Sequence, residues 1–364
     1  MALADLFQPL TVRSMTLPNR FAMAPMTREA SPHGIPGIDV ADYYRRRASG
    51  GVGLIITEGI RLPDPAAGYP SSVPTIAGDE AISGWARVVE GIHAEGATIA
   101  AQLWHQGIER RDDDGVQPVG PSAIDGRGQP RGRALSADEL AEIAQLYAAS
   151  AATARDLGFD AVEIHGAHGY LLDEFFWERT NRRTDRYGGS LAARTRFPAE
   201  VVGAVRAAVG PDYPIIFRFS QWKGRDYSAS IAEDPTVLQQ WLTPLVEAGV
   251  DLLHPSSRRH YTPGFPDHNP ALSLAGWTKK VSGKPVIAVG SVGLDTQFRS
   301  EKRGEVIGPA PIDPVVEQFD AGEFDVVAIG RALLADPNWV NRLRDGDWDG
   351  FVGYDFAAAL SALS

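Results

Sequence analysis

The chain has 364 residues, of which 44% are hydrophobic, and a formal net charge of −11. This length allows a large buried core, and an α/β barrel of this size can occupy residues 1–364 as a single domain. An acidic surface repels phosphate backbones, so nucleic acid is not an expected partner. The chain contains no cysteine, which excludes disulfides, iron–sulfur clusters and a cysteine nucleophile.

The first residues lack the basic and apolar regions of a signal peptide. No apolar stretch approaches membrane-spanning length. We therefore expect a soluble, cytoplasmic protein without a membrane partner, present as a monomer or homodimer.

A β-hairpin is predicted at residues 10–17, under the floor of a barrel. Eight short segments rich in Val, Ile and Phe follow along the chain, and none alternates strictly between polar and apolar residues. This pattern is typical of strands buried on both faces, as in a parallel sheet covered by helices. The eight predicted strands are residues 21–26, 53–58, 98–104, 161–165, 215–220, 251–255, 285–290 and 326–330.

Helical patterns separate the predicted strands, at residues 40–48, 80–95, 136–157, 190–209 and 271–281. Ser136 and Glu139 form a capping-box pattern. Three further helices are expected to open with Asp-Pro pairs, at residues 234–235, 313–314 and 336–337, because aspartate caps a helix and proline suits its first position. Eight alternating units predict a (β/α)₈ TIM barrel. The alternative, a doubly wound open sheet, would carry a Gly-x-Gly-x-x-Gly turn after the first strand, and none is present there.

Two connections are long. Residues 107–133 show no periodicity, and they are interpreted either as a lid or binding loop or as a tolerated surface insertion. Residues 301–309 are charged and are expected to be a small insertion.

Barrel enzymes place their sites at the C-terminal ends of the strands, so the residues there are the candidates. Gly290 and the pair Gly330-Arg331 end the last two strands, where backbone N–H groups and a guanidinium can bind a phosphate, although either glycine could serve only a tight turn. Arg218 lies inside a strongly apolar strand, so it must pair with Glu58 or Glu163 or face a ligand.

Two histidines and a tyrosine, His165, His168 and Tyr170, end the fourth strand. Each histidine alone could be a satisfied structural residue, but three such groups together favour a site. A histidine pair can donate two hydrogen bonds to one oxygen, and a tyrosine can supply a proton.

The chain resembles the Old Yellow Enzyme family of FMN-dependent ene-reductases over nearly its whole length. The matching segments are residues 18–28 (PNRFAMAPMTR), 56–59 (ITEG), 102–104 (QLW), 163–172 (EIHGAHGYLL), 181–190 (NRRTDRYGGS), 194–197 and 330–331 (GR). A threonine at position 27, where one branch of the family has cysteine, points to the threonine branch.

The resemblance implies a role for each matching residue around tightly bound, non-covalent FMN. The residues implied to hold the cofactor are Pro25, Met26, Thr27, Gly59, Gln102, Arg218, Gly290, Ser291, Gly330 and Arg331. His165 and His168 would bind the carbonyl or nitro oxygen of an activated alkene, Tyr170 would protonate its α-carbon, and Trp104 and Thr27 would shape the substrate pocket. NAD(P)H would reduce the FMN, which would pass hydride to the β-carbon of the alkene.

Two other classes of protein remain open from the residues alone. Strand-end histidines, which include His105 and His254, would suit a metal-dependent barrel hydrolase, although no metal site is assigned. A non-catalytic flavin or phosphate binder would keep Arg218 and Gly330-Arg331 but would not need His165, His168 and Tyr170 together.

Overall fold

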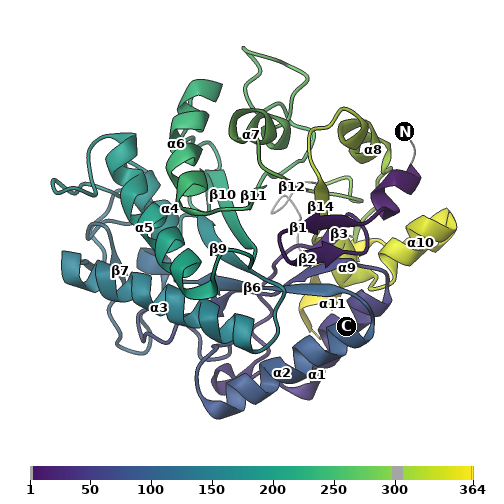
Figure 1. The fold of residues 1–364 in the computed structure, drawn as a ribbon, viewed down its shortest axis with the longest axis horizontal. Coiled ribbons are helices and arrows are strands. Elements are labelled where there is room, and N and C mark those ends of the chain that lie inside the picture. The colour runs from purple at the N-terminus through teal and green to yellow at the C-terminus, as the bar shows by residue number, and fades with distance from the viewer. Residues whose placement is uncertain (1–2, 297–305, 362, 364) are drawn as a thin grey trace.

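The computed structural model describes residues 3–296, 306–361 and 363. Eight parallel strands occupy its centre and helices surround them (Figure 1). Each predicted apolar segment overlaps one of these strands, although β9 and β10 extend beyond their predicted ends. They are β3 (Phe21–Met23), β4 (Leu54–Ile56), β6 (Thr98–Trp104), β9 (Ala161–His168), β10 (Ile215–Lys223), β11 (Leu252–Pro255), β12 (Ile287–Val289) and β14 (Val326–Ile329). A short extra strand, β5 (Ile60–Arg61), also pairs with β6.

The strands form a closed barrel. They pair in the order β11-β10-β9-β6-β4-β3-β14-β12. Parallel bridges from Leu253 to Val286 and from Ser256 to Val289 then join β11 to the β12 segment and complete the ring. The predicted TIM barrel is confirmed, and the open-sheet alternative is wrong because the first and last β/α units pair through β3 and β14.

The outer helices follow the predicted segments closely. They are α1 (Ile38–Ser49), α2 (Asp79–Ala94), α3 (Ala137–Asp156), α5 (Leu191–Val209), α6 (Pro235–Ala248), α7 (Leu274–Ser282), α8 (Asp313–Asp320) and α10 (Trp339–Asp345). Shorter helices that the sequence patterns did not indicate are η1 (Leu3–Phe7), η2 (Pro32–Gly34), η3 (Gly107–Glu109), α4 (Leu171–Phe176), α9 (Arg331–Ala335), η4 (Trp348–Gly350) and α11 (Phe356–Ser361).

The predicted helix caps are correct at two positions and wrong at two. Ser136 forms the capping box with Glu139, and Asp234 accepts from two backbone N–H groups at the start of α6. At α8 the cap position is Ile312, with no side-chain cap. At α10 the helix starts only at Trp339, because the Asp336 carboxylate accepts from the Asn338 N–H and pairs with Arg342 instead of capping.

The N-terminal hairpin closes the barrel floor. Its strands β1 (Leu10–Val12) and β2 (Met15–Leu17) pair antiparallel, with Leu10 opposite Leu17. Met15 and Leu17 are buried in one apolar cluster with inward-facing barrel residues such as Ala22 and Ile216. The predicted hairpin is confirmed, and it supplies the bottom layer of the barrel core.

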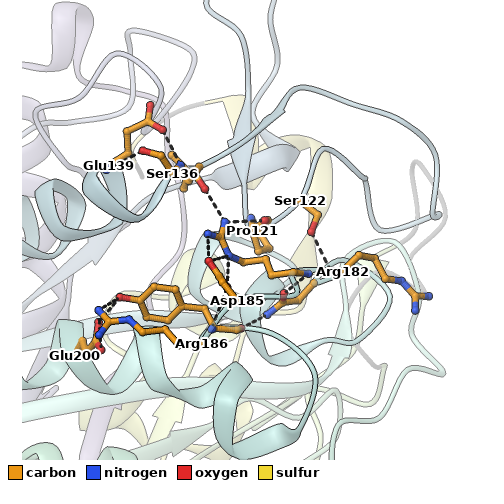
Figure 2. A network of polar contacts seen from close by, with 12 residues as sticks. Pro121, Ser122, Ser136, Glu139, Arg182, Asp185, Arg186 and Glu200 are labelled. Atoms are coloured by element: carbon orange, nitrogen blue, oxygen red, sulfur yellow. Dashed lines mark hydrogen bonds and ion pairs between the residues drawn. The ribbon is translucent and has the colours of Figure 1, made fainter.

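The long connection after β6 is ordered by a second segment of the chain. Within it β7 (Val119–Gly120) pairs with β8 (Arg133–Ala134). Arg183 donates to the carbonyl oxygens of Pro121 at 3.1 Å and Leu135 at 2.5 Å, and the Arg182 N–H donates to Ser122 Oγ (Figure 2). Residues 181–190 therefore help to order this connection, and its role as a lid or binding loop or as a tolerated insertion stays a prediction.

The second long connection is described only in part. Residues 301–305 of the expected insertion lie outside the described residues. The following strand β13 (Val306–Ile307) pairs antiparallel with β15 (Tyr354–Asp355), which brings the C-terminal segment close to the end of the barrel.

Leu17→Ala tests the role of the hairpin as a floor. Leu17 is fully buried, so the substitution leaves a cavity and should lower the free energy of unfolding by ~2–5 kcal/mol. Thr16→Ala, at the exposed neighbouring position, should change it by less than ~0.5 kcal/mol. Urea denaturation measures both values. Equal effects of the two substitutions would contradict the packing of the hairpin against the barrel.

Candidate active site

A layer of polar side chains lies above the apolar floor, inside the barrel. Side chains alternate between the two faces of a strand, so the residues two positions beyond the buried apolar layer also point inward. Four consecutive strands place Gln102 (β6), Glu163 (β9), Arg218 (β10) and His254 (β11) at this height, and all four are at least 94% buried. These four residues are called the polar layer below.

Hydrogen bonds connect the polar layer. Gln102 Nε2 donates to Glu163 Oε1 at 2.7 Å, and His254 Nδ1 lies 2.5 Å from Glu163 Oε2. The Arg218 guanidinium donates to Ser256 Oγ at 3.3 Å. Burial lowers the pKa of Arg218 and the charge of Glu163 opposes that shift, so of the two glutamates that the sequence left open, Glu163 is the one whose charge acts on Arg218. Glu58 instead accepts from the Arg28 N–H.

The predicted substrate residues meet at the end of β9. The ring centres of His165 and His168 are 5.2 Å apart, and those of His165 and Tyr170 are 5.4 Å apart. Trp104, from the end of β6, packs edge-on against Tyr170 at 4.9 Å and lies 6.3 Å from His165. The fold therefore brings together all four aromatic and imidazole rings that the sequence singled out here.

A buried ion pair holds the turn that carries these rings. His168 has a φ of 67°, which is unusual for a residue other than glycine. The Gly169 N–H donates to one oxygen of Asp173, and the other oxygen lies 2.6 Å from Lys223 Nζ. Asp173 and Lys223 are fully or almost fully buried. Asp173 thus links the turn, through the Gly169 N–H, to Lys223 at the end of β10.

The sequence patterns did not identify two residues of the site, Trp222 and Ser256. Trp222 stacks on His168 at 4.4 Å with 22° between the rings, and Ser256 Oγ lies 2.8 Å from His168 Nε2. The fifth strand was predicted to end at Ser220, whereas β10 continues to Lys223 past an irregularity in its pairing with β9. Extending the inward alternation by one more step would have found Trp222.

Both histidines are neutral in this environment. Burial and the nearby charge of Arg218 lower the pKa of His165 to about 3 and the pKa of His168 well below its ordinary value. A neutral imidazole carries one N–H donor. Within the described residues, His165 Nδ1 is buried and has no hydrogen-bond partner.

The predicted phosphate residues also lie together. Arg331 donates to the carbonyl oxygen of Thr296 at 2.6 Å and to Ser291 Oγ at 3.2 Å, so the ends of β12 and β14 converge. Gly290 has a φ of 137°, and a Cβ there would lie 2.6 Å from the Ser257 carbonyl oxygen. Packing of the neighbouring loop therefore already requires a glycine at this position.

The remaining predicted cofactor residues surround the same barrel end. A Cβ on Gly59 would lie 2.5 Å from Trp104, so this glycine allows the indole to cover the end of β4. Pro25 and Met26 are half-buried and Thr27 is exposed, directly after β3. Met26 Sδ lies 3.5 Å from the position of a Cβ on Gly330, which joins these two predicted groups.

The other strand-end histidines have structural partners. His105 Nδ1 accepts from the Gly107 N–H, and His254 binds Glu163. In the ranges 3–296, 306–361 and 363, no three histidine, aspartate or glutamate side chains are grouped so that they could hold a metal ion. The structure therefore gives the hydrolase alternative no metal site among these residues.

Residues 5–349 match the model of the NADH:flavin oxidoreductase / NADH oxidase family. The chain belongs to this family. It is 35% identical to the NADH oxidase of Thermoanaerobacter brockii over 94% of this chain, which spans 51% of that protein. It is 33% identical to 12-oxophytodienoate reductase 7 of Oryza sativa subsp. japonica, over 94% of this chain and 88% of that protein.

Solved structures support the same family and fold. A morphinone reductase in complex with tetrahydroNAD has a TM-score of 0.78 and 32% identity, over 98% of this chain and 96% of that one. The old yellow enzyme homologue from Zymomonas mobilis has a TM-score of 0.79 and 27% identity, over 98% and 99%. The chain is therefore an NAD(P)H-dependent flavin oxidoreductase of the Old Yellow Enzyme family, and its cofactor is FMN.

The residues at the barrel end fit FMN. Buried polar atoms without a hydrogen-bond partner among the described residues include Arg218 Nε, His165 Nδ1 and Trp104 Nε1. Leaving such atoms unpaired is costly, so a bound polar ligand would satisfy them.

None of the described helices is both long and apolar enough to cross a membrane.

Asp173→Asn tests the ion pair below the turn. The substitution leaves the buried Lys223 without its countercharge and should lower the free energy of unfolding by ~3–5 kcal/mol. Asp345→Asn removes the exposed pair with Arg344 and should cost no more than ~1 kcal/mol. Urea denaturation compares the two variants. A stability of Asp173→Asn equal to that of Asp345→Asn would show that the buried pair does not hold the turn.

Proposed function

We propose that the chain is an FMN-dependent ene-reductase, which reduces α,β-unsaturated carbonyl or nitro compounds with NAD(P)H. The observation that carries this proposal is the meeting of two neutral histidines and a tyrosine at the end of β9, beside the buried cation of Arg218. A hydrogen-bonding pair, a proton donor and a cation are the groups that alkene reduction by a flavin requires. The relatives named 12-oxophytodienoate reductase and morphinone reductase support a small oxo compound as substrate.

The cofactor would be held by groups at both sides of the barrel end. Gln102 and Arg218 would bind the polar edge of the flavin ring, while Pro25, Met26, Thr27 and Gly59 would line the ring. Thr27 in this position supports a place for the chain in the threonine branch of the family. The phosphate would lie at the converging ends of β12 and β14. Its binding residues would be Gly290, Ser291, Gly330 and Arg331.

When bound, FMN supplies the chemistry of the reaction by accepting hydride from NAD(P)H and returning it to the β-carbon of the alkene. His165 and His168 donate hydrogen bonds to the substrate oxygen and draw electron density from the alkene. Tyr170 donates its hydroxyl proton to the α-carbon. Arg218 stabilises negative charge in a site that excludes water. Trp104 packs against Tyr170 and shapes the pocket.

Tyr170→Phe separates the proton donor from the rest of the site. Loss of the hydroxyl should slow reduction of an enone by the pre-reduced enzyme about 100-fold or more, the usual range for a general acid. Reduction of the enzyme by NAD(P)H should stay within about twofold, because that step needs no proton from Tyr170. Anaerobic stopped-flow measurement of the two half-reactions gives both rates. An equal loss in both would exclude the proton-donor role.

The double variant His165→Ala, His168→Ala tests the oxygen-binding pair. Phenols that bind to oxidised flavin produce a long-wavelength charge-transfer band, and their oxygen would accept from the two imidazoles. Loss of both donors should weaken phenol binding about 100-fold. His93→Ala, on the outer helix α2, should bind phenols like the wild type. Because both histidines are neutral, their contribution should stay constant from pH 5 to pH 8.

Unchanged phenol affinity in the double variant would contradict the assignment of the two histidines. A change in the histidine contribution with an apparent pKa near 6.5 would contradict their neutral state in the site.

A further inference from the structure

Glu163 lies at the centre of the polar layer and has no role in the proposed reaction. Its side chain is fully buried inside the barrel. Both carboxylate oxygens are engaged, Oε1 by Gln102 Nε2 at 2.7 Å and Oε2 by His254 Nδ1 at 2.5 Å. A buried carboxylate is costly unless such partners satisfy it. Packing alone therefore does not account for a glutamate at this position, because an apolar residue would fill the space without the cost of a buried charge.

Glu163 is ionised in this environment. Burial alone would raise its pKa, but the interactions with His254, Arg218 and Gln102 outweigh burial and hold the pKa below its ordinary value. Burial lowers the pKa of His254, and the charge and hydrogen bond of Glu163 oppose that shift, so His254 Nδ1 carries the proton that the carboxylate accepts. The negative charge of Glu163 also opposes the effect of burial on the Arg218 cation.

An ionised carboxylate only accepts hydrogen bonds, and this fixes the direction of its neighbours. The Gln102 amide must turn its NH₂ group to Glu163, which leaves its carbonyl oxygen to accept from a ligand. His254 must carry its proton on Nδ1. Its Nε2 is buried with no partner among the described residues. Glu163 therefore decides which groups of the polar layer remain as acceptors.

We propose that Glu163 is a positioning residue that sets the reduction potential of the bound FMN, by orienting the Gln102 amide and by offsetting the charge of Arg218. The proposal rests on the placement of the flavin against Gln102 and Arg218 given under Proposed function. A cation near a flavin favours the reduced form, which is more negative, and a nearby carboxylate opposes that preference. Glu163 thus moderates the effect of Arg218 without touching the reacting atoms.

Glu163→Gln is the central test, because it removes the charge and keeps the shape. With Arg218 no longer offset, the variant should bind reduced FMN at least tenfold more favourably relative to oxidised FMN. That change corresponds to a potential about 30 mV more positive for two electrons. Oxidised FMN should bind about tenfold more weakly, because a neutral amide at position 163 can donate as well as accept and no longer fixes the direction of Gln102.

The readouts are the midpoint potential, from anaerobic dye-coupled reduction, and the dissociation constant of FMN, from quenching of its fluorescence by the apoprotein. Glu174→Gln is the control for the change of shape and hydrogen bonding alone. Glu174 is also a buried glutamate, but burial raises its pKa well above the ordinary value, so its substitution removes no charge. It accepts from the Ile108 N–H beside α4 and makes no described contact with the polar layer. Its substitution should leave the potential and the FMN affinity unchanged.

Arg218→Gln and the double variant Glu163→Gln, Arg218→Gln complete the test and keep it informative if Glu163→Gln alone does not fold. Arg218→Gln should lower the potential, since the remaining charge is negative. The double variant removes both charges, so its potential should be more positive than that of Arg218→Gln and close to the wild type. The difference between the two Arg218 variants isolates the contribution of Glu163.

Three results would overturn the inference, and they are distinguishable. If Arg218→Gln lowers the potential but removal of the Glu163 charge changes it in neither background, Glu163 is a structural residue only and the proposed function stands. If neither position affects the potential, the flavin does not lie against the polar layer and the proposed cofactor placement fails as well. A shift of the same size in Glu174→Gln would also refute a specific role for Glu163.

Discussion

Closure of the parallel sheet determines the direction of every side chain at this site. Once β3 pairs with β14 and the bridges to β12 complete the ring, alternate residues of each strand must point into one narrow interior. The hairpin and an apolar layer fill its lower part. The next inward position on four neighbouring strands is the polar layer. Its members meet because of barrel geometry, although they are separated by as many as 152 residues, from Gln102 to His254.

The barrel accommodates its buried carboxylates by giving each one close hydrogen-bond partners. Glu163 is satisfied by Gln102 and His254 while it faces Arg218, and Asp173 binds Lys223 and the Gly169 N–H. The second pair holds the turn on which the proposed proton donor stands. Removal of either partner of such a pair costs more than the pair contributes, so these ions constrain the site more than they stabilise the fold.

The family motif at residues 181–190 has a different role from the residues of the active site. Residues 181–190 do not contact the histidines in any described interaction. Arg183 and Arg182 instead bind the connection after β6, and the Tyr187 hydroxyl donates to Glu200 on α5 (Figure 2). The motif thus orders a long loop beside the active site. Its residues are specific to the family for a structural reason, and they need no catalytic role.

The sequence alone determined the eight strands, the outer helices, the hairpin floor and the choice of strand ends where chemistry was expected. Local patterns suffice for these features, because apolar runs, helix-capping residues and hydrophobic periodicity can each be recognised within a short segment of sequence. The motif from His165 to Tyr170 and the Gly330-Arg331 pair were likewise visible, since their residues are neighbours in the chain.

Only the tertiary structure decided which distant residues are partners. It placed Arg218 under the influence of the charge of Glu163 rather than of Glu58, and it extended β10 so that Trp222 stacks on His168. It also paired Asp336 with Arg342 instead of using Asp336 as a helix cap. It also made both histidines neutral, through burial and the charge of Arg218. Long-range pairing and burial depend on how the ring of strands closes, and no local segment carries that information.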